Sequence, residues 1–212
     1  MPFFYTVTVM ASKVYFTEGT APEDALKAFR ALGKELPGKI AIKVHSGEEG
    51  NQNYLTPDFW RPTVKAAGGT VVECNTAYPG ERDSTEKHRK LIHEHSWDAF
   101  DFDLMDAEGP DDVLEVPDGK VIKKDYVGKD LKNYDSLLVL AHFKGHPMGG
   151  FGGALKQLSS AAPRPTARPT STAQGTPTGI TSPRSRTFSW SPWRMRPRQW
   201  CAASAGTWPS SA

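Results

Sequence analysis

Residues 136–158 read SLLVLAHFKGHPMGGFGGALKQL and open with the most apolar run of the chain. The run 136–141 (SLLVLA) predicts a central strand buried on both faces, because strands of parallel sheets read as continuous apolar segments. A glycine-rich segment follows this strand and leads into a predicted helix that ends near Leu158. A strand that enters a helix in this way is typical of α/β folds, in which ligands gather at the carboxyl ends of strands.

Strand and helix patterns alternate ahead of this stretch. Residues 39–44 (KIAIKV) and 70–74 (TVVEC) predict two buried strands, and residues 57–67 between them predict a helix. The other expected elements are helices over 22–32 and 84–95, a strand over 102–105, and a hairpin or inserted β-arm over 114–127. The alternation therefore predicts an α/β fold with a mostly parallel sheet flanked by helices.

The last quarter of the chain differs in composition from the rest. Residues 159–212 contain seven Arg and no Lys, Asp, Glu or His, so this segment carries +7 while residues 1–158 carry −5. The segment also holds eight Pro, ten Ser and eight Thr, which predicts a disordered tail that cannot bury a core. The charge of residues 1–158 indicates neither a nucleic-acid-binding protein nor a strongly acidic one.

The tail also has features that disorder does not explain. Four of the six Trp lie in it, although aromatic residues are scarce in disordered segments. Trp, Arg, Pro, Ser and Ala are together the residues that GC-rich DNA encodes when it is read out of frame. We therefore hypothesise a frameshift near Ser159, which would leave the α/β domain truncated at its C-terminal side. A natural disordered tail is the alternative.

Two cysteines, Cys74 and Cys201, are too few for a disulfide framework or a four-thiolate metal site. The N-terminal run MPFFYTVTVM lacks a basic region and a cleavage site, and no stretch approaches the roughly 20 apolar residues of a membrane span. We therefore expect a cytoplasmic protein with neither a membrane nor a nucleic acid as its partner.

The glycine-rich segment after residue 141 predicts an anion-binding site. Its glycines allow backbone N–H groups to turn inward, and the lysines and imidazoles beside them add positive charge or proton transfer. The expected anion-binding residues are His142, Lys144, Gly149, Gly150, Gly152 and Gly153, with Lys156 nearby. The segment matches neither a Walker loop nor a dinucleotide fingerprint. A glycine-rich turn that serves only close packing is the alternative.

A second loop is expected at the same edge of the sheet. Asn75, Tyr78 and Arg82 follow the strand TVVEC, and the Arg82 guanidinium could bind a carboxylate through two hydrogen bonds. Capping and turn roles explain Asn75 almost as well.

Other polar residues are weaker candidates. The spacing of His88, His93 and His95 does not suit a metal site and favours solvated or half-buried imidazoles. Cys74 is expected to be a small buried residue rather than a nucleophile. The acidic run from Asp101 to Asp111 favours a solvated loop over a cation site.

Several ordered motifs resemble one known family. The segments are KVYFTE (13–18), LPGKIAIKVHSGEEGNQNYL (36–55), VECNTAYPGERDSTEKH (72–88), DLMDAEG (103–109) and YDSLLVLAHFKGHPMGGFGGALK (134–156). Together they resemble the N-terminal part of the domain-of-unknown-function 362 family, described as iron-sulfur-centre proteins. The resemblance covers about residues 12–158, which suggests an upstream extension over 1–9, a domain over 10–158 and the tail over 159–212.

The resemblance implies a redox or electron-transfer role, with an electron-transfer partner, for the intact family member. Such a member is expected to continue into a ferredoxin-like cysteine cluster that ligates [4Fe-4S], whereas this chain supplies no cofactor ligands of its own. A fainter resemblance links His146 and Lys156, ten residues apart, to nickel-pincer lactate racemases. It implies a catalytic pair, with Lys156 as the cofactor anchor and His146 as the acid/base, although the Asp-x-x-Arg-Pro motif of that family is missing.

Three functions stay open at this point. The first is an iron-sulfur-linked redox protein whose N-terminal domain binds a small anionic molecule. The second is a racemase-like or isomerase-like enzyme, and the third is a non-catalytic anion-binding module.

Overall fold

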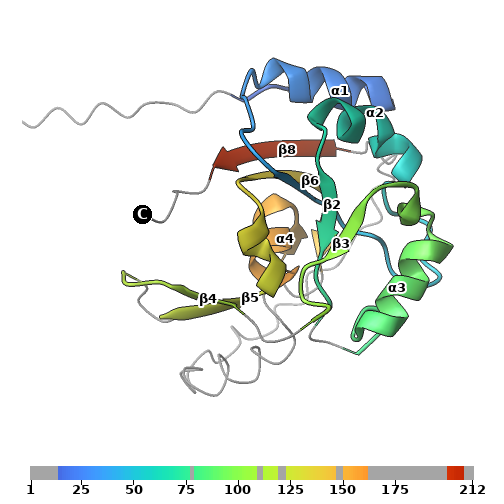
Figure 1. The fold of residues 1–212 in the computed structure, drawn as a ribbon. Helices are drawn as coiled ribbons and strands as arrows, with labels where there is room; N and C mark the ends of the chain where they lie inside the picture. Colours follow the sequence, from blue (N-terminus) through green and yellow to red (C-terminus); the bar gives the residue numbers. More distant parts are fainter. Residues whose placement is uncertain are drawn as a thin grey trace, which may run out of the picture.

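The computed structural model describes residues 14–76, 79–108, 112–118, 123–146, 150–161 and 200–207 (Figure 1). The elements are, in chain order, α1 (Pro22–Ala31), β1 (Ile40–Lys43), α2 (Pro57–Ala67), β2 (Thr70–Glu73), α3 (Thr85–Glu94), the 3-10 helix η1 (Trp97–Ala99), β3 (Phe102–Leu104), β4 (Asp112–Glu115), β5 (Lys124–Val127), the 3-10 helix η2 (Lys129–Asn133), β6 (Ser136–His146), β7 (Gly150–Gly152), α4 (Ala154–Ala161) and β8 (Trp200–Thr207). The predicted upstream extension, residues 1–9, lies outside the described residues.

Four strands form a parallel sheet in the order β3-β2-β1-β6. Ile42 of β1 lies opposite Val71 of β2 on one side and opposite Leu138 of β6 on the other. Two antiparallel strands pair with β6: β8 along residues 136–143 and β7 along residues 144–146. The predicted α/β fold with a mostly parallel sheet is confirmed, and SLLVLA is an inner strand of that sheet.

Both faces of the sheet are covered, because successive residues of a strand point to opposite sides. Helices α1, α2 and α3 pack on the face of Ile42, and they contribute Ala25, Trp60, Val64 and Ile92 to the main core cluster. The opposite face carries a smaller cluster of Ala41, Val72, Cys74, Met105 and Tyr134, with Leu131 of η2 packed against it. Neighbouring Ala41 and Ile42 thus belong to different cores.

Helix α2 shows how local sequence sets the element bounds. Thr56 precedes the helix, and its Oγ1 accepts a hydrogen bond from the Phe59 N–H at 3.4 Å. Pro57 occupies the first helical position, where an N–H would have no partner within the helix. Gly68 ends the helix in the left-handed conformation, with a φ of 71°, and strand β2 begins at Thr70.

Three further strands are not part of the parallel arrangement: β4 and β5 form a separate sheet, and β8 adds to β6 in the antiparallel direction. β4 and β5 form an antiparallel two-stranded sheet, which confirms the hairpin expected over residues 114–127. β8 falls within the segment predicted to be a disordered tail; residues 162–199 and 208–212 of that segment lie outside the described residues. Among the helices that are described, none is long and apolar enough to cross a membrane.

Candidate functional site

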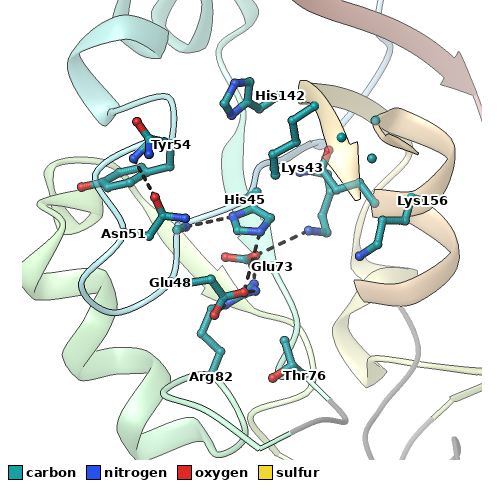
Figure 2. Close-up of a pocket in the computed structure, with 17 residues that line it drawn as sticks. Lys43, His45, Glu48, Asn51, Tyr54, Glu73, Thr76, Arg82, His142 and Lys156 are labelled. Carbon is teal, nitrogen blue, oxygen red and sulfur yellow. Dashed lines mark hydrogen bonds and ion pairs between the residues drawn. The ribbon is translucent and has the colours of Figure 1, made fainter. Parts of the chain in front are cut away.

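A cavity of about 390 Å³ lies at the carboxyl ends of β1 and β2, beside the long strand β6 (Figure 2). Its walls come from the ends of β1 and β2 with the loops that follow them, from β6 and β7, and from the first turns of α4. The charged and imidazole side chains that line it are Lys43, His45, Glu48, Glu73, Arg82, His142, Lys144 and Lys156.

Glu73 is the centre of a buried network beneath the cavity. We call Lys43, Glu73, Arg82 and His88 the floor network; each of them is at most 2% exposed. Arg82 Nη1 donates to Glu73 Oε1 at 2.8 Å, and Lys43 Nζ lies 3.9 Å from the same oxygen. The second oxygen, Oε2, accepts a hydrogen bond from the Ser46 N–H at 3.1 Å and lies 3.3 Å from His88 Nε2. One carboxylate therefore connects residues of β1, β2, α3 and two loops.

Arg82 also links the two loops at the edge of the sheet. Its Nη1 binds Glu73, while Nη2 and Nε reach the carboxylate of Glu48 in the loop after β1. Both cavity-facing carboxylates are thus bound by the same guanidinium, which is the planar group best suited to several carboxylate hydrogen bonds.

His88 is fully buried, so the expectation of a solvated or half-buried imidazole is wrong for this residue. Its Nδ1 lies 3.1 Å from Asn75 Oδ1, and its Nε2 lies 3.3 Å from Ser46 Oγ. Asn75 donates from Nδ2 to Thr85 Oγ1 at 3.1 Å, and its backbone N–H donates to the Asp106 carboxylate. Asn75 therefore holds the loop together and does not line the cavity.

Burial and charge act on the floor network in opposite directions. Burial lowers the pKa of the Lys43 ammonium, and the nearby Glu73 carboxylate opposes this effect. Burial alone would raise the pKa of Glu73, but the positive charges of Lys43 and Arg82 and the His88 hydrogen bond outweigh it. They hold the pKa of the Glu73 carboxyl well below its ordinary value. Glu73 is therefore an ionised carboxylate at the centre of the network.

The loop over residues 45–48 is held in one conformation. The Ser46 carbonyl oxygen accepts hydrogen bonds from His95 Nδ1 at 2.8 Å and from Trp97 Nε1 at 3.0 Å. Gly47 has a φ of 105°, and a Cβ at this position would lie 2.8 Å from His95 Nδ1 and 3.1 Å from Tyr54. Only glycine fits there, because both the backbone angle and the packing exclude a side chain.

This loop also sets the protonation of His45. The Gly47 N–H donates to His45 Nδ1 at 3.0 Å, which leaves the proton of the neutral imidazole on Nε2. Burial and the positive charge of Arg82 lower the pKa of His45 to about 3. Its Nε2 faces the cavity, 3.9 Å from Glu48 Oε1 and beyond hydrogen-bond distance. His45 is thus a neutral imidazole whose Nε2–H faces the cavity.

The opposite side of the cavity is built by β6, β7 and α4. We call His142, Lys144, Lys156 and Gln157 the wall. A Cβ at Gly152 would lie 3.7 Å from Lys156 Cδ and 3.9 Å from Lys144 Cγ, so the stems of both lysines pass this glycine. Burial and the neighbouring charge of Lys156 lower the pKa of Lys144. Both lysine side chains therefore line the same part of the cavity, and the charge of Lys156 acts on Lys144.

The wall also contains buried polar atoms without a partner. Gln157 is 8% exposed, and neither its Nε2 nor its Oε1 has a hydrogen-bond partner within the described part of the chain. The buried Nδ1 of His142 likewise lacks a partner there. Burial and the charge of Lys144 lower the pKa of His142, which favours the neutral imidazole.

Comparison with known proteins gives one family. The domain of unknown function DUF362 matches residues 40–183, which is more than half of the chain. The chain belongs to the DUF362 family. No curated protein and no solved structure matches it. The match includes the whole cavity lining and extends beyond the predicted domain boundary at Leu158, into residues that the frameshift hypothesis assigns to the wrong reading frame. That hypothesis stays a prediction.

The cavity of this DUF362 domain brings together six of the residues predicted from sequence. They are Arg82, His142, Lys144, Gly152, Gly153 and Lys156. Gly150 begins β7 with a φ of 74° and does not line the cavity. Tyr78 and Gly149 lie outside the described residues, and His146 is described only as the last residue of β6. Whether His146 and Lys156 form a pair therefore stays a prediction.

Sequence reasoning missed three residues of the floor network, Lys43, Glu73 and His88, and it missed Gln157 of the wall. Lys43 and Glu73 are the last residues of β1 and β2, and a charged residue that ends an apolar strand was the available signal. For His45 the only available signal was its position directly after the strand KIAIKV. For Gln157 the sequence held no signal, because its burial depends on how α4 packs.

The weaker candidates have structural roles or no described site. Cys74 is fully buried, as predicted, and burial raises the pKa of its thiol well above the ordinary value. Asp106 is 1% exposed and accepts the Asn75 N–H, so the acidic run is not wholly a solvated loop. Among the residues that the structure describes, no group of three or more His, Cys, Asp or Glu could hold a metal ion.

Proposed function

We propose that this DUF362 domain binds a small organic anion, carrying a carboxylate or phosphate group, in the cavity between the floor network and the wall. The observation that carries the proposal is the charge of the lining. Four cationic side chains face two carboxylates there, and Arg82 already binds both carboxylates. Lys144 and Lys156 thus contribute an excess of positive charge.

The position of these two lysines supports the same conclusion. The aliphatic parts of both side chains lie beside Gly152. The two positive charges repel each other, and the charge of Lys156 contributes to the lowered pKa of Lys144. An anion between them would relieve this repulsion and replace the water lost by burial. The edge of the sheet where β1 and β2 end is also where α/β folds commonly bind ligands.

The redox and racemase expectations lack comparable support. A [4Fe-4S] cluster needs several thiolate ligands, whereas the chain has two cysteines, of which Cys74 is buried with a raised thiol pKa. The residues of this chain therefore do not fit a cluster. For the racemase expectation, Lys156 lines the cavity, but nothing described places the His146 side chain beside it. Anion binding is the function that these residues support best.

Calorimetric titration of the full chain with succinate and with inorganic phosphate tests the proposal. We expect saturable binding of at least one of these anions, and a loss of about 10-fold to 100-fold in affinity in Lys144→Met and in Lys156→Met, since each removes a charge-assisted hydrogen bond. Lys90→Met is the matched control, because Lys90 is 65% exposed on α3 and does not line the cavity. Absence of binding by the wild-type protein, or equal loss in all three variants, would contradict the proposal.

A further inference from the structure

Buried polar atoms without partners are concentrated at one place. In the described part of the chain there are four such side-chain atoms: Thr63 Oγ1, His142 Nδ1, Gln157 Nε2 and Gln157 Oε1. Three of them belong to residues that line the cavity. Folded proteins rarely leave buried polar atoms unpaired, because each then loses its hydrogen bonds to water without replacement. Their accumulation at the wall indicates that a ligand completes them.

The unpaired atoms of Gln157 and His142 require a different ligand group from the one that the ammonium groups of the lysines bind. The Gln157 amide offers two N–H donors on Nε2 and one acceptor atom, Oε1. A carboxylate or a fully ionised phosphate ester can accept from Nε2 but has no hydrogen to donate to Oε1. A hydroxyl group can do both, since it donates one hydrogen bond and accepts others.

The neutral groups are interleaved with the charged ones. His142 and Lys144 are two residues apart on β6 and therefore point to the same face of the strand. Gln157 directly follows Lys156 on α4, and both residues line the cavity. Neutral and charged side chains of β6 and of α4 thus line one cavity, so one small molecule can contact both kinds of group.

Resting on the proposed function, we infer that Gln157 and His142 select an organic anion that also carries a hydroxyl group. The lysines bind the charged group of the ligand. The Gln157 amide pairs with the hydroxyl through both of its polar atoms, and His142 Nδ1 binds the same or a second hydroxyl. The ligand class is therefore a hydroxy acid or a hydroxylated phosphate ester.

Two pairs of probes distinguish a hydroxy acid from a hydroxylated phosphate ester. Within each pair the two probes differ only in their hydroxyl groups. Malate differs from succinate by one hydroxyl, and glycerol 3-phosphate differs from propyl phosphate by two. In calorimetric titrations of the full chain we expect the hydroxylated member of at least one pair to bind about tenfold more tightly, the effect of one additional hydrogen bond. The pair that shows the preference identifies the charged group as carboxylate or phosphate.

Gln157→Leu removes the amide and keeps a side chain of similar size. We expect the preference for the hydroxylated probe to fall to about twofold or less, while the affinity for the plain anion stays within about twofold. The melting temperature of the ligand-free variant should be unchanged or higher, because an unpaired buried amide has been replaced by an apolar group. Thr63→Val is the matched control, since Thr63 Oγ1 is also unpaired and buried but lies outside the cavity lining.

The outcomes are distinguishable. If in both pairs the wild-type protein binds the plain anion as tightly as its hydroxylated partner, the inference fails, while anion binding stands. A preference that persists in both Gln157→Leu and His142→Phe would also overturn it. If none of the four probes and no inorganic phosphate binds, both the inference and the proposed function fail.

Discussion

The floor network and the wall border the same cavity, but they differ in how their polar and charged groups are paired. In the floor network each charge has a close partner: Arg82 Nη1 lies 2.8 Å from Glu73 Oε1, and Lys43 Nζ donates to the Val44 carbonyl oxygen at 2.7 Å. In the wall two ammonium groups repel each other, and the amide of Gln157 has no partner in the described part of the chain.

This difference predicts that the floor network contributes to the stability of the fold, whereas the wall contributes to binding. The floor network is complete without a ligand, so its ion pairs belong to the folded state and hold the ends of β1 and β2 in place. The wall contains buried atoms of His142 and Gln157 that have no partner in the described part of the chain, and residues arranged for binding commonly reduce the stability of the unliganded protein. Substitutions in the floor should therefore change stability first, whereas those in the wall should change binding first.

Replacing the central carboxylate is expected to have the largest effect. Glu73→Gln leaves the buried charges of Lys43 and Arg82 without their shared partner, and loss of one member of a buried ion pair costs about 3–5 kcal/mol. Urea unfolding followed by circular dichroism measures the change. The control is Glu94→Gln, whose carboxylate is 46% exposed and pairs with Lys90 on the surface, and it should cost less than about 0.5 kcal/mol. Equal effects of the two substitutions would mean that the floor network does not support the fold.

The neutral His45 predicts a pH dependence of intermediate size. Its pKa is about 3 in the folded protein, against 6.5 when unperturbed, so between these values the unfolded chain binds the proton and the folded protein does not. The stability due to His45 is therefore fully present above about pH 6.5 and is lost as the pH falls toward 3. By linkage the loss at pH 5 is at most about 2 kcal/mol.

His45→Asn isolates this contribution, because Asn keeps an acceptor for the Gly47 N–H but does not titrate. The free energy of unfolding of the variant should fall less than that of the wild-type protein between pH 7.5 and pH 5. Parallel curves for the two proteins would show that the imidazole is not held neutral in the folded protein.

More of the fold than of the candidate site could be predicted from the sequence. Apolar runs such as KIAIKV and SLLVLA reflect burial on both faces of a sheet, so strand positions followed from the sequence. Pro57 and Gly68 similarly marked both ends of α2. The pairing of β7 and β8 with β6 could not be foreseen, because it depends on contacts between segments that are distant or irregular in the sequence.

Site residues near glycines were found because the glycine-rich segment is visible locally. Lys144 and Lys156 therefore appeared among the candidates. The other floor residues, Lys43, Glu73 and His88, were missed because they come from separate elements, and only the register of β1 and β2 with the packing of α3 brings them together. The prediction of a solvated or half-buried imidazole was wrong for His88 for the same reason, since its partners lie 13 to 42 residues away.

The smallest change in stability is expected in the wall. Lys144→Met removes a charge that the folded state disfavours, as the lowered pKa of Lys144 shows, and the side chain is exposed enough for solvent to screen most of the effect. The free energy of unfolding should therefore stay constant or rise by up to about 0.5 kcal/mol, even though the same variant is expected to lose anion binding. A measured loss above about 1 kcal/mol would place Lys144 among residues that support the fold. The division between a structural floor and a binding wall would then not hold at β6.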